Sequence, residues 1–248
     1  MNKCILEYIW IDDNKLLSTT HIININDNFP EIYNYKNIIK PCFICKNYLK
    51  KLDNCYLVLC DLYDLNNNPL STNNRYNNNI FDLINYDKMQ DDNEPYFILT
   101  QNYQFVTIDV NNQKILDEHL LACIYADINI SKSDFGVFNI GPCLGITASD
   151  QLYISKYLLE KISEKYNTNI IYNNIIIYFS TKETKESNGI NTIYNYINNL
   201  ELQNPEYNFN FKIPSFTLKN KSGYFEISQL KETDPYLITS LIYKSCCL

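Results

Sequence analysis

The spacing of apolar and polar residues predicts strands and helices along most of the chain. The clearest strand candidate covers residues 95–107 (PYFILTQNYQFVT), where apolar residues such as Phe97 and Leu99 recur at alternate positions. Thr100 and Asn102 share one face of this strand, because residues two apart in a strand point the same way. That face carries no charge.

The first part of the chain is predicted to form a small sheet. Residues 5–11 and 15–21 read as a hairpin, and the continuous apolar run 56–62 reads as a buried strand. Residues 22–54 are polar with little periodicity and contain Pro30 and Pro41, which predicts loops with one short strand. Residues 80–84 are expected to form a short helix.

Helices dominate the predictions for the second part. Apolar residues at helical spacing predict helices over 113–126 and 151–165, and Asp150 is expected to cap the second of these. Asp234 followed by Pro235 is a typical helix start, which predicts a helix to residue 247. The remaining predicted elements are a strand over 170–180, a helix over 191–200 and short strands over 209–213 and 223–225.

The acidic segment 87–94 is the best candidate for a domain boundary, which divides the chain into residues 1–92 and 93–248. Strands and helices follow one another without regular βαβ alternation. This mixture favours an α+β fold over a doubly wound parallel sheet.

Composition and charge exclude several classes of function. The net charge is −7, so no general basic surface is available for nucleic acid or anionic lipid. No apolar run reaches transmembrane length, and the N-terminus does not read as a signal peptide, so a cytoplasmic location is expected. The abundance of Asn, Ile, Tyr and Lys is typical of an AT-rich genome.

The nine cysteines are expected to be reduced thiols. Cys42 and Cys45 form a CxxC pair, with Cys55 and Cys60 downstream. A zinc site built from these four would have irregular spacing and no second CxxC, so buried or loop thiols are the favoured interpretation.

Motifs for phosphate binding and hydrolysis are absent from the sequence. There is no GxxxxGKS loop, HExxH or GxSxG, and the five glycines do not cluster. Arg75 is the only arginine, and one arginine cannot build several bidentate clamps. His21 is expected in a loop, and His119 is expected to be a packed or surface histidine on a helix rather than a base.

Segments along the chain resemble glutamine synthetases of the eukaryotic type. Residues 140–164 (IGPCLGITASDQLYISKYLLEKISE) are similar to IGPCxGIxxGDHLWxARxxLxRxxE, and residues 57–75 (LVLCDLYDLNNNPLSTNNR) to VLCDxYxxxGxPxxTNxR. Further matching words are YIWID, PYFILTQNYQF, EHLLACIYADINI, FSTK, FKIP, GYFE and DPYLITSLIYKSCCL. The words follow the family order over almost the whole chain, so the chain is identified as a member.

The resemblance implies a chemistry that this chain has largely lost. The family makes glutamine from glutamate, ammonia and ATP, with divalent metals held by carboxylates and arginines that clamp the phosphoryl group. The two glutamates of the family word EQE fall on Thr100 and Asn102, and the glutamate of AEV falls on Gly136. The histidine of GxHTN falls on Ile176, and the segment containing NARRLTG is missing.

Few candidate site residues remain under this resemblance. Glu226 matches a metal-binding glutamate, although a solvated glutamate at a strand end is the favoured interpretation when it stands alone. Tyr96 and Ser180 match positions near the nucleotide base, although packing and turn roles are favoured. Asp134 and Asp150 are, with Glu226, the candidates for carboxylates that replace the lost ones.

The resemblance therefore implies an α+β fold with a small N-terminal β-grasp-like domain and a shortened catalytic-type domain, an antiparallel sheet backed by helices. A catalytically inactive pseudoenzyme with a binding, regulatory or structural role is the leading hypothesis. Self-association or association with an intact glutamine synthetase is the expected partnership, without nucleic acid or membrane. No cofactor is expected. The alternatives are residual ATP-dependent glutamate–ammonia ligase activity, which would need Mg²⁺ and ATP, and an expressed remnant without selected activity.

Overall fold

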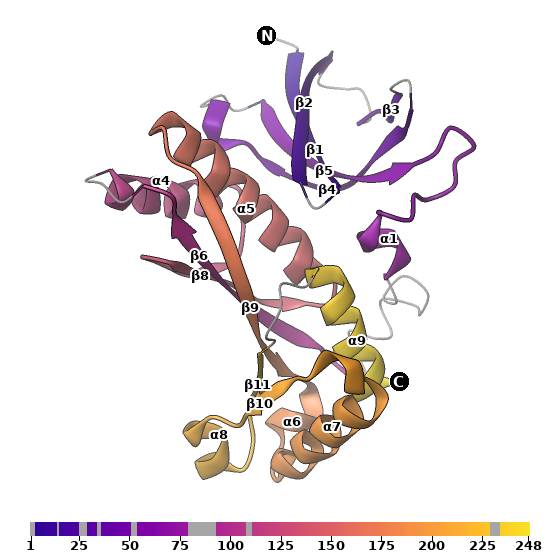
Figure 1. The fold of residues 1–248 in the computed structure, drawn as a ribbon, viewed down its shortest axis with the longest axis vertical. Helices are drawn as coiled ribbons and strands as arrows, with labels where there is room; N and C mark the ends of the chain where they lie inside the picture. Colours follow the sequence, from indigo (N-terminus) through magenta and orange to yellow (C-terminus); the bar gives the residue numbers. More distant parts are fainter. Residues whose placement is uncertain are drawn as a thin grey trace.

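A computed structural model describes residues 3–13, 15–24, 29–33, 36–50, 54–78, 93–107, 111–228 and 234–248. The described chain forms a five-stranded sheet from its N-terminal part and a six-stranded sheet from its C-terminal part, with helices between and below them (Figure 1). We call these the N-terminal sheet and the C-terminal sheet. The fold is mixed α/β, as the element pattern predicts.

The N-terminal sheet has the strand order β2-β1-β5-β4-β3. Its strands are β1 (Lys3–Asp12), β2 (Lys15–Asn24), β3 (Ile32–Tyr33), β4 (Ile38–Lys46) and β5 (Cys55–Tyr63). β1 and β2 pair as the predicted hairpin, and the predicted buried strand is β5. β1 and β5 are parallel, whereas the other neighbours are antiparallel, so this sheet is mixed.

The prediction of loops with one short strand over residues 22–54 is wrong for β4, which is a nine-residue strand between β5 and β3. Pro41 suggested a break because proline cannot donate a ladder hydrogen bond. It lies where the register between β4 and β5 shifts, at an irregularity that tolerates proline. His21 lies in β2, in agreement with the hairpin predicted over residues 15–21, so the separate expectation that it lies in a loop is wrong.

The C-terminal sheet has the order β10-β11-β9-β6-β8-β7 and is antiparallel throughout. The predicted central strand is β6, and the predicted strand over residues 170–180 is β9. The strands are β6 (Tyr96–Phe105), β7 (Ile130–Asp134), β8 (Val137–Leu144), β9 (Ile170–Ser180), β10 (Asn210–Lys212) and β11 (Phe225–Ser228). β11 begins two residues later than the sequence predicts.

Of the described helices, the four longest follow the predictions, and the three short ones were not predicted. The described helices are α1 (Asn74–Asn77), α4 (Asn112–Tyr125), α5 (Thr147–Lys165), α6 (Lys182–Lys185), α7 (Gly189–Gln203), α8 (Ser215–Asn220) and α9 (Pro235–Cys247), with 3₁₀ turns at Tyr48–Lys50 and Pro205–Tyr207. Asp234 caps α9, since its Oδ1 accepts the backbone N–H of Tyr236 at 2.9 Å. The capping role predicted for Asp150 is wrong: α5 starts at Thr147, and Asp150 lies in its first turn.

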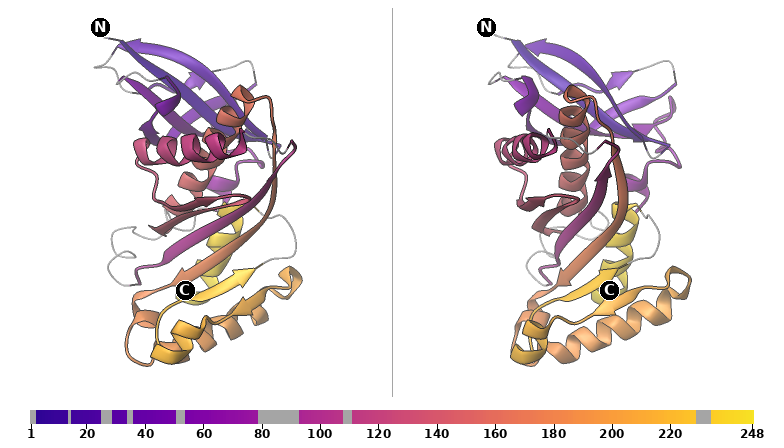
Figure 2. Two further views of the ribbon diagram at one scale, coloured as in Figure 1. Left: turned by 90° about the vertical axis from the view of Figure 1, so that its left-hand side faces the viewer. Right: turned by 60° about the vertical axis from the view of Figure 1, so that its left-hand side comes forward.

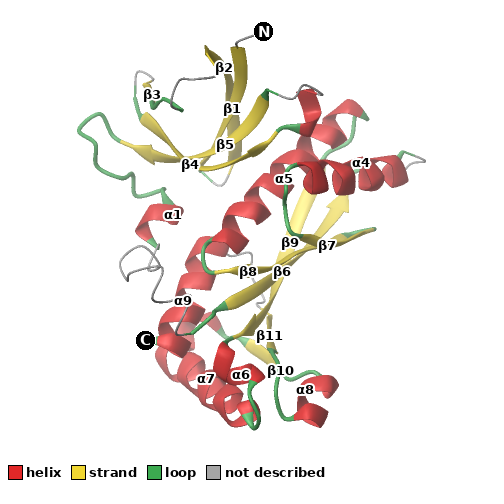
Figure 3. Ribbon diagram, turned by 180° about the vertical axis from the view of Figure 1, so that it is seen from behind, coloured by secondary structure: helices red, strands yellow, loops and turns green. Residues whose placement is uncertain are grey.

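Helix α5 packs against strands of both sheets, which places it at the centre of the molecule (Figures 1 and 3). The large core between α4, α5 and the C-terminal sheet continues into the N-terminal sheet through residues such as Leu57 and Leu59. A smaller core covers the opposite face of the N-terminal sheet. The helix predicted over residues 80–84 and most of the predicted boundary lie outside the described residues, so the division at residue 92 stays a prediction.

The cysteines of the described chain are free thiols. Cys45 belongs to the large core and Cys60 to the small core, so the sheet separates two of the four possible zinc ligands. None of the described helices is long and apolar enough to cross a lipid bilayer.

Candidate functional site: the outer face of the C-terminal sheet

The C-terminal sheet has one face that packs on helices α4 and α5, as the turned views show (Figure 2). In β6, Phe97, Leu99 and Tyr103 point into that core. The side chains that alternate with them form the opposite face, which we call the outer face. Thr100 and Asn102 lie on it, as the alternation of β6 predicts.

Thr100 is buried on the outer face between neighbouring strands. It lies opposite Asn139 of β8 and Ile176 of β9, and its side-chain hydroxyl has no hydrogen-bond partner. The Oδ1 atom of Asn139 also has no partner. The Nδ2 group of Asn102 donates to the backbone oxygen of Asn174 at 3.4 Å. This part of the face therefore presents neutral oxygens and amides where the resemblance implies two metal-binding carboxylates.

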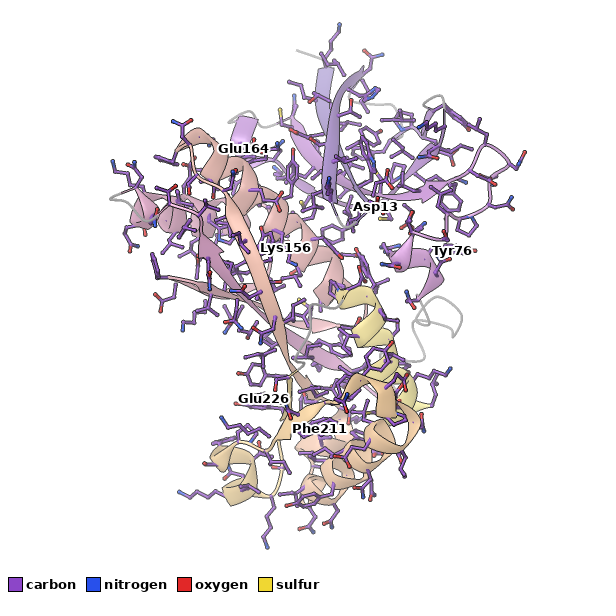
Figure 4. All side chains as sticks on the ribbon, viewed as in Figure 1. Asp13, Tyr76, Lys156, Glu164, Phe211 and Glu226 are labelled. Atoms are coloured by element: carbon purple, nitrogen blue, oxygen red, sulfur yellow. The ribbon has the colours of Figure 1, made fainter. Side chains whose placement is uncertain are left out.

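Glu226 lies half-buried on the same face, in β11 (Figure 4). Its cross-strand neighbours are Tyr178 of β9 and Lys212 of β10. Burial raises the pKa of the Tyr178 hydroxyl, and the charge of the neighbouring Glu226 carboxylate raises it further. Glu226 therefore has a phenol and a lysine as its strand neighbours rather than further carboxylates.

The three candidate carboxylates do not come together. Glu226 on β11 and Asp134 on β7 are separated by the three strands β9, β6 and β8, about 19 Å at the usual strand spacing. Asp134 is exposed and lies 3.6 Å from the Nζ of Lys132. Asp150 is buried in α5, where Arg75 holds it. Among the described residues, no group of three or more acidic, histidine or cysteine side chains could hold a metal ion.

Tyr96 and Ser180 are direct cross-strand neighbours in β6 and β9. They share the outer face with Glu226, because Ser180 lies two residues beyond Tyr178 in an unbroken register. The Nζ of Lys185 lies 3.9 Å from the centre of the Tyr96 ring, a cation–π contact. The ammonium group of Lys185 therefore covers one face of the Tyr96 ring.

His119 is a packed histidine, one of the two roles expected from the sequence. It is fully buried in α4, and its Nε2 lies 3.0 Å from the Ser155 hydroxyl and 3.1 Å from the Ser155 carbonyl oxygen in α5. Burial lowers the pKa of the imidazole to about 4. A neutral histidine enclosed between two helices has no access to a substrate on the outer face.

A buried ionic cluster that the sequence did not predict joins the N-terminal sheet to three helices. The Nε and Nη2 atoms of Arg75 donate to the two carboxylate oxygens of Asp150 at 2.9 and 3.2 Å. Its Nη1 donates to Asp61 of β5 at 3.2 Å, and the Tyr236 hydroxyl of α9 donates to Asp150 at 2.8 Å. The only feature of the sequence that could have indicated this cluster is that Arg75 is the single arginine. The cluster ties α1, β5, α5 and α9 together and uses Asp150 for structure.

A second buried carboxylate makes a similar connection. Glu7 of β1 accepts hydrogen bonds from the Tyr157 hydroxyl of α5 and, at 3.3 Å, from the side-chain amide of Asn47. The Ser18 hydroxyl of β2 donates to the same carboxylate at 3.4 Å. The polar groups between the N-terminal sheet and α5 thus hold the two parts together.

Replacing Thr100 by valine is expected to stabilise the fold by about 1 kcal/mol. Valine keeps the branched shape and removes a buried hydroxyl that has no partner, and an unsatisfied buried group costs about 1–3 kcal/mol. The urea midpoint of unfolding should rise with an unchanged slope. Thr239→Val is the matched control, because the Thr239 hydroxyl donates to the Pro235 carbonyl oxygen at 2.8 Å and its loss should destabilise. A fall in stability for Thr100→Val would contradict the prediction.

The fold and this face define a mixed α/β protein with two sheets joined by a central helix, a class that fits a shortened glutamine synthetase fold. No family model matches the sequence. The chain is 27% identical to a protein provisionally named glutamine synthetase of Acanthamoeba polyphaga mimivirus, with 98% of this chain and 94% of that protein covered. It is 25% identical to glutamine synthetase cytosolic isozyme 1-1 of Oryza sativa subsp. japonica, covering 83% and 78%, and 22% identical to glutamine synthetase of Panulirus argus, covering 99% and 93%.

The chain is therefore a short homologue of the glutamine synthetases, which confirms the family identified from the sequence. The alignment with the mimivirus protein runs over 341 positions, whereas the chain has 248 residues. That relative thus contains segments without a counterpart here, which agrees with the internal deletions implied by the matching words.

Proposed function

We propose that this chain is a glutamine synthetase-like pseudoenzyme: it does not catalyse glutamine synthesis, and its role is binding, regulatory or structural. The observation that carries the proposal is the neutral character of Thr100 and Asn102 on the outer face. A site that bridges ATP phosphates with Mg²⁺ uses carboxylate oxygens, and a hydroxyl and an amide do not supply that negative charge.

The surroundings of Glu226 support the same proposal. A divalent cation of this kind takes about six or more oxygen ligands, several of them from carboxylates or waters. Asp134 is too distant to share an ion with Glu226, and Asp150 is already bound to Arg75. No cofactor is proposed for this face. Glu226 remains the residue that would bind Mg²⁺ if any family activity were retained, and Tyr96 and Ser180 those that would contact ATP.

We further propose that the chain keeps the two-part design implied by the resemblance. Residues 1–92 would correspond to a β-grasp-like domain and residues 93–248 to a shortened catalytic-type domain. The parallel pairing of β1 and β5 within an otherwise antiparallel sheet supports the first assignment. Self-association, or association with an intact glutamine synthetase, is the proposed partnership in the cytoplasm.

The second candidate function is residual ATP-dependent glutamate–ammonia ligase activity. The names of the relatives favour it, since they include glutamine synthetases from a plant, a crustacean and a virus. The chemistry of the outer face argues against it, because the positions that should carry the metal-binding charge are neutral.

A coupled assay of ADP release tests the choice between the two. With glutamate, ammonia, Mg²⁺ and ATP, we expect no ADP release above that measured without glutamate, because the γ-phosphoryl group has no metal clamp. An active glutamine synthetase assayed in parallel shows that the conditions support turnover.

The Glu226→Gln variant is the matched control for the assay. Glutamate-dependent ADP release by the natural chain that disappears in this variant would overturn the pseudoenzyme proposal. It would establish Glu226 as a residue of a working metal site.

A further inference from the structure

Among the described residues, strand β2 is an open edge of the N-terminal sheet. Alternate residues of an antiparallel strand direct their backbone N–H and C=O groups to opposite sides, so about half of those in β2 point away from its neighbour β1. The other sheet edges of the described chain are shorter. β3 has two residues and β10 has three, and the five-residue β7 carries Lys132 and Asp134. β3 pairs with β4 at two positions, and the rest of that edge of β4 carries Lys40, Pro41 and Lys46. Among the described strands, β2, with ten residues, is the longest edge.

The sequence of β2 lacks the features that usually protect such an edge. Natural edges carry lysine, proline or inward charges that prevent pairing with another chain. Within β2, Lys15 stands at the first position, and residues 16–24 contain no Pro, Lys, Arg, Asp or Glu. Leu17 and Ile22 are 40% and 63% exposed. This edge is open, long and partly apolar.

We propose that β2 pairs with β2 of a second copy of this chain, so that the two N-terminal sheets form one continuous sheet. The pairing is antiparallel and two-fold symmetric, which requires one residue to lie opposite itself. With Thr19 at the centre, Leu16 lies opposite Ile22 of the second copy, and the symmetry produces this aliphatic pair twice.

The side-chain pattern favours this occupant and this register. The pairing covers Ile22, the most exposed side chain among the large apolar residues of β2, with a leucine. The symmetric register centred on Thr20 would instead place Ser18 opposite Ile22. No carboxylate lies in β2, so the contact avoids the acidic groups that give each copy its charge of −7.

Self-association is also part of the function proposed above, and its biological meaning rests on that proposal. The physical contact does not depend on whether the chain turns over substrate. Measurements of mass and of crosslinking therefore test the contact separately from the ADP-release assay.

Cysteine crosslinking tests the register. In the proposed pairing Cβ atoms of Thr19 and of its symmetry mate lie about 4.5–5.5 Å apart, close to the range that a disulfide spans. The Thr19→Cys variant should form a disulfide-linked dimer under mild oxidation. The matched variant Thr20→Cys should form little, because its Cα atoms are more than about 7 Å apart. The natural chain gives the background from its own cysteines.

Sedimentation equilibrium tests the association itself. The average mass should rise above 29.2 kDa toward twice that value as the concentration approaches about 1 mM, and added salt should favour the dimer by screening the net charge. Ile22→Lys should remove the rise. Leu202→Lys, which replaces an 80% exposed leucine on α7, should not.

Three results would overturn the proposal. They are a monomeric natural chain over the whole range, an Ile22→Lys variant that dimerises as well as the natural chain, and equal crosslinking of the two cysteine variants. Preferred crosslinking of Thr20→Cys would exclude the proposed register.

Discussion

Replacing Arg75 by methionine is expected to lower the free energy of unfolding by about 3–5 kcal/mol, because removing one partner leaves the buried charges of the others without a counter-charge. Arg75 donates to Asp150 through two atoms and to Asp61 through a third. Both carboxylates are buried, and after the substitution Asp150 keeps the hydroxyl of Tyr236 but no cation in the cluster. Urea unfolding followed by circular dichroism measures the loss.

Two variants show whether the geometry of the guanidinium carries this stability. Arg75→Lys keeps the charge but replaces the planar fork by a point charge that cannot make the same bidentate contact, so we expect an intermediate loss. Lys161→Met removes an exposed ion pair to Glu164 three residues away in α5, and its effect should stay below about 0.5 kcal/mol. An Arg75→Met variant as stable as Lys161→Met would contradict the expected role of the cluster.

Local patterns in the sequence were enough to predict several of the elements that form the core. The alternation in β6, the apolar run in β5 and the Asp234 cap of α9 each depend on residues close together in the chain. The matching family words added the order of the segments. The face of β6 on which Thr100 and Asn102 lie also followed from alternation alone.

The predictions that failed concern contacts between segments that are far apart in the sequence. β4 was not predicted as a long strand because Pro41 lies at an irregularity that exists only when β5 lies beside it. Asp150 looked like a helix cap or a metal ligand because its partner Arg75 is 75 positions away in the sequence. The separation of Glu226 from Asp134 follows from the strand order, which local spacing does not encode.

Acidification from pH 7 to pH 4 is expected to destabilise the protein through His119 by about 3 kcal/mol. Burial lowers the pKa of this imidazole to about 4, whereas an unfolded chain has a histidine pKa near 6.5. Between these values the unfolded state binds the proton and the folded state does not. Each unit of pKa difference corresponds to about 1.4 kcal/mol, so the stability is complete above pH 6.5 and is lost as the pH falls toward 4.

Glu160 opposes this trend over part of the same range. Burial raises the pKa of its carboxyl group to about 6, with Lys156 opposing the shift, so the folded state binds a proton here before the unfolded state does. Protonation of Glu160 therefore adds stability to the folded state as the pH falls from about 6 toward the pKa of the unfolded chain, near 4.5. The natural chain should show a shallower acid slope than His119 alone would give.

Urea unfolding at several pH values separates the two groups. His119→Gln should reduce the loss of stability between pH 6.5 and 4.5 by about 2 kcal/mol, because no group at position 119 then takes up a proton on unfolding. Glu160→Gln should make the loss steeper. His21→Gln removes the other histidine, which lies half-buried on β2, and serves as the matched control. If His119→Gln kept the slope of the natural chain, the acid sensitivity would have to come from the remaining carboxylates rather than from the histidine enclosed between α4 and α5.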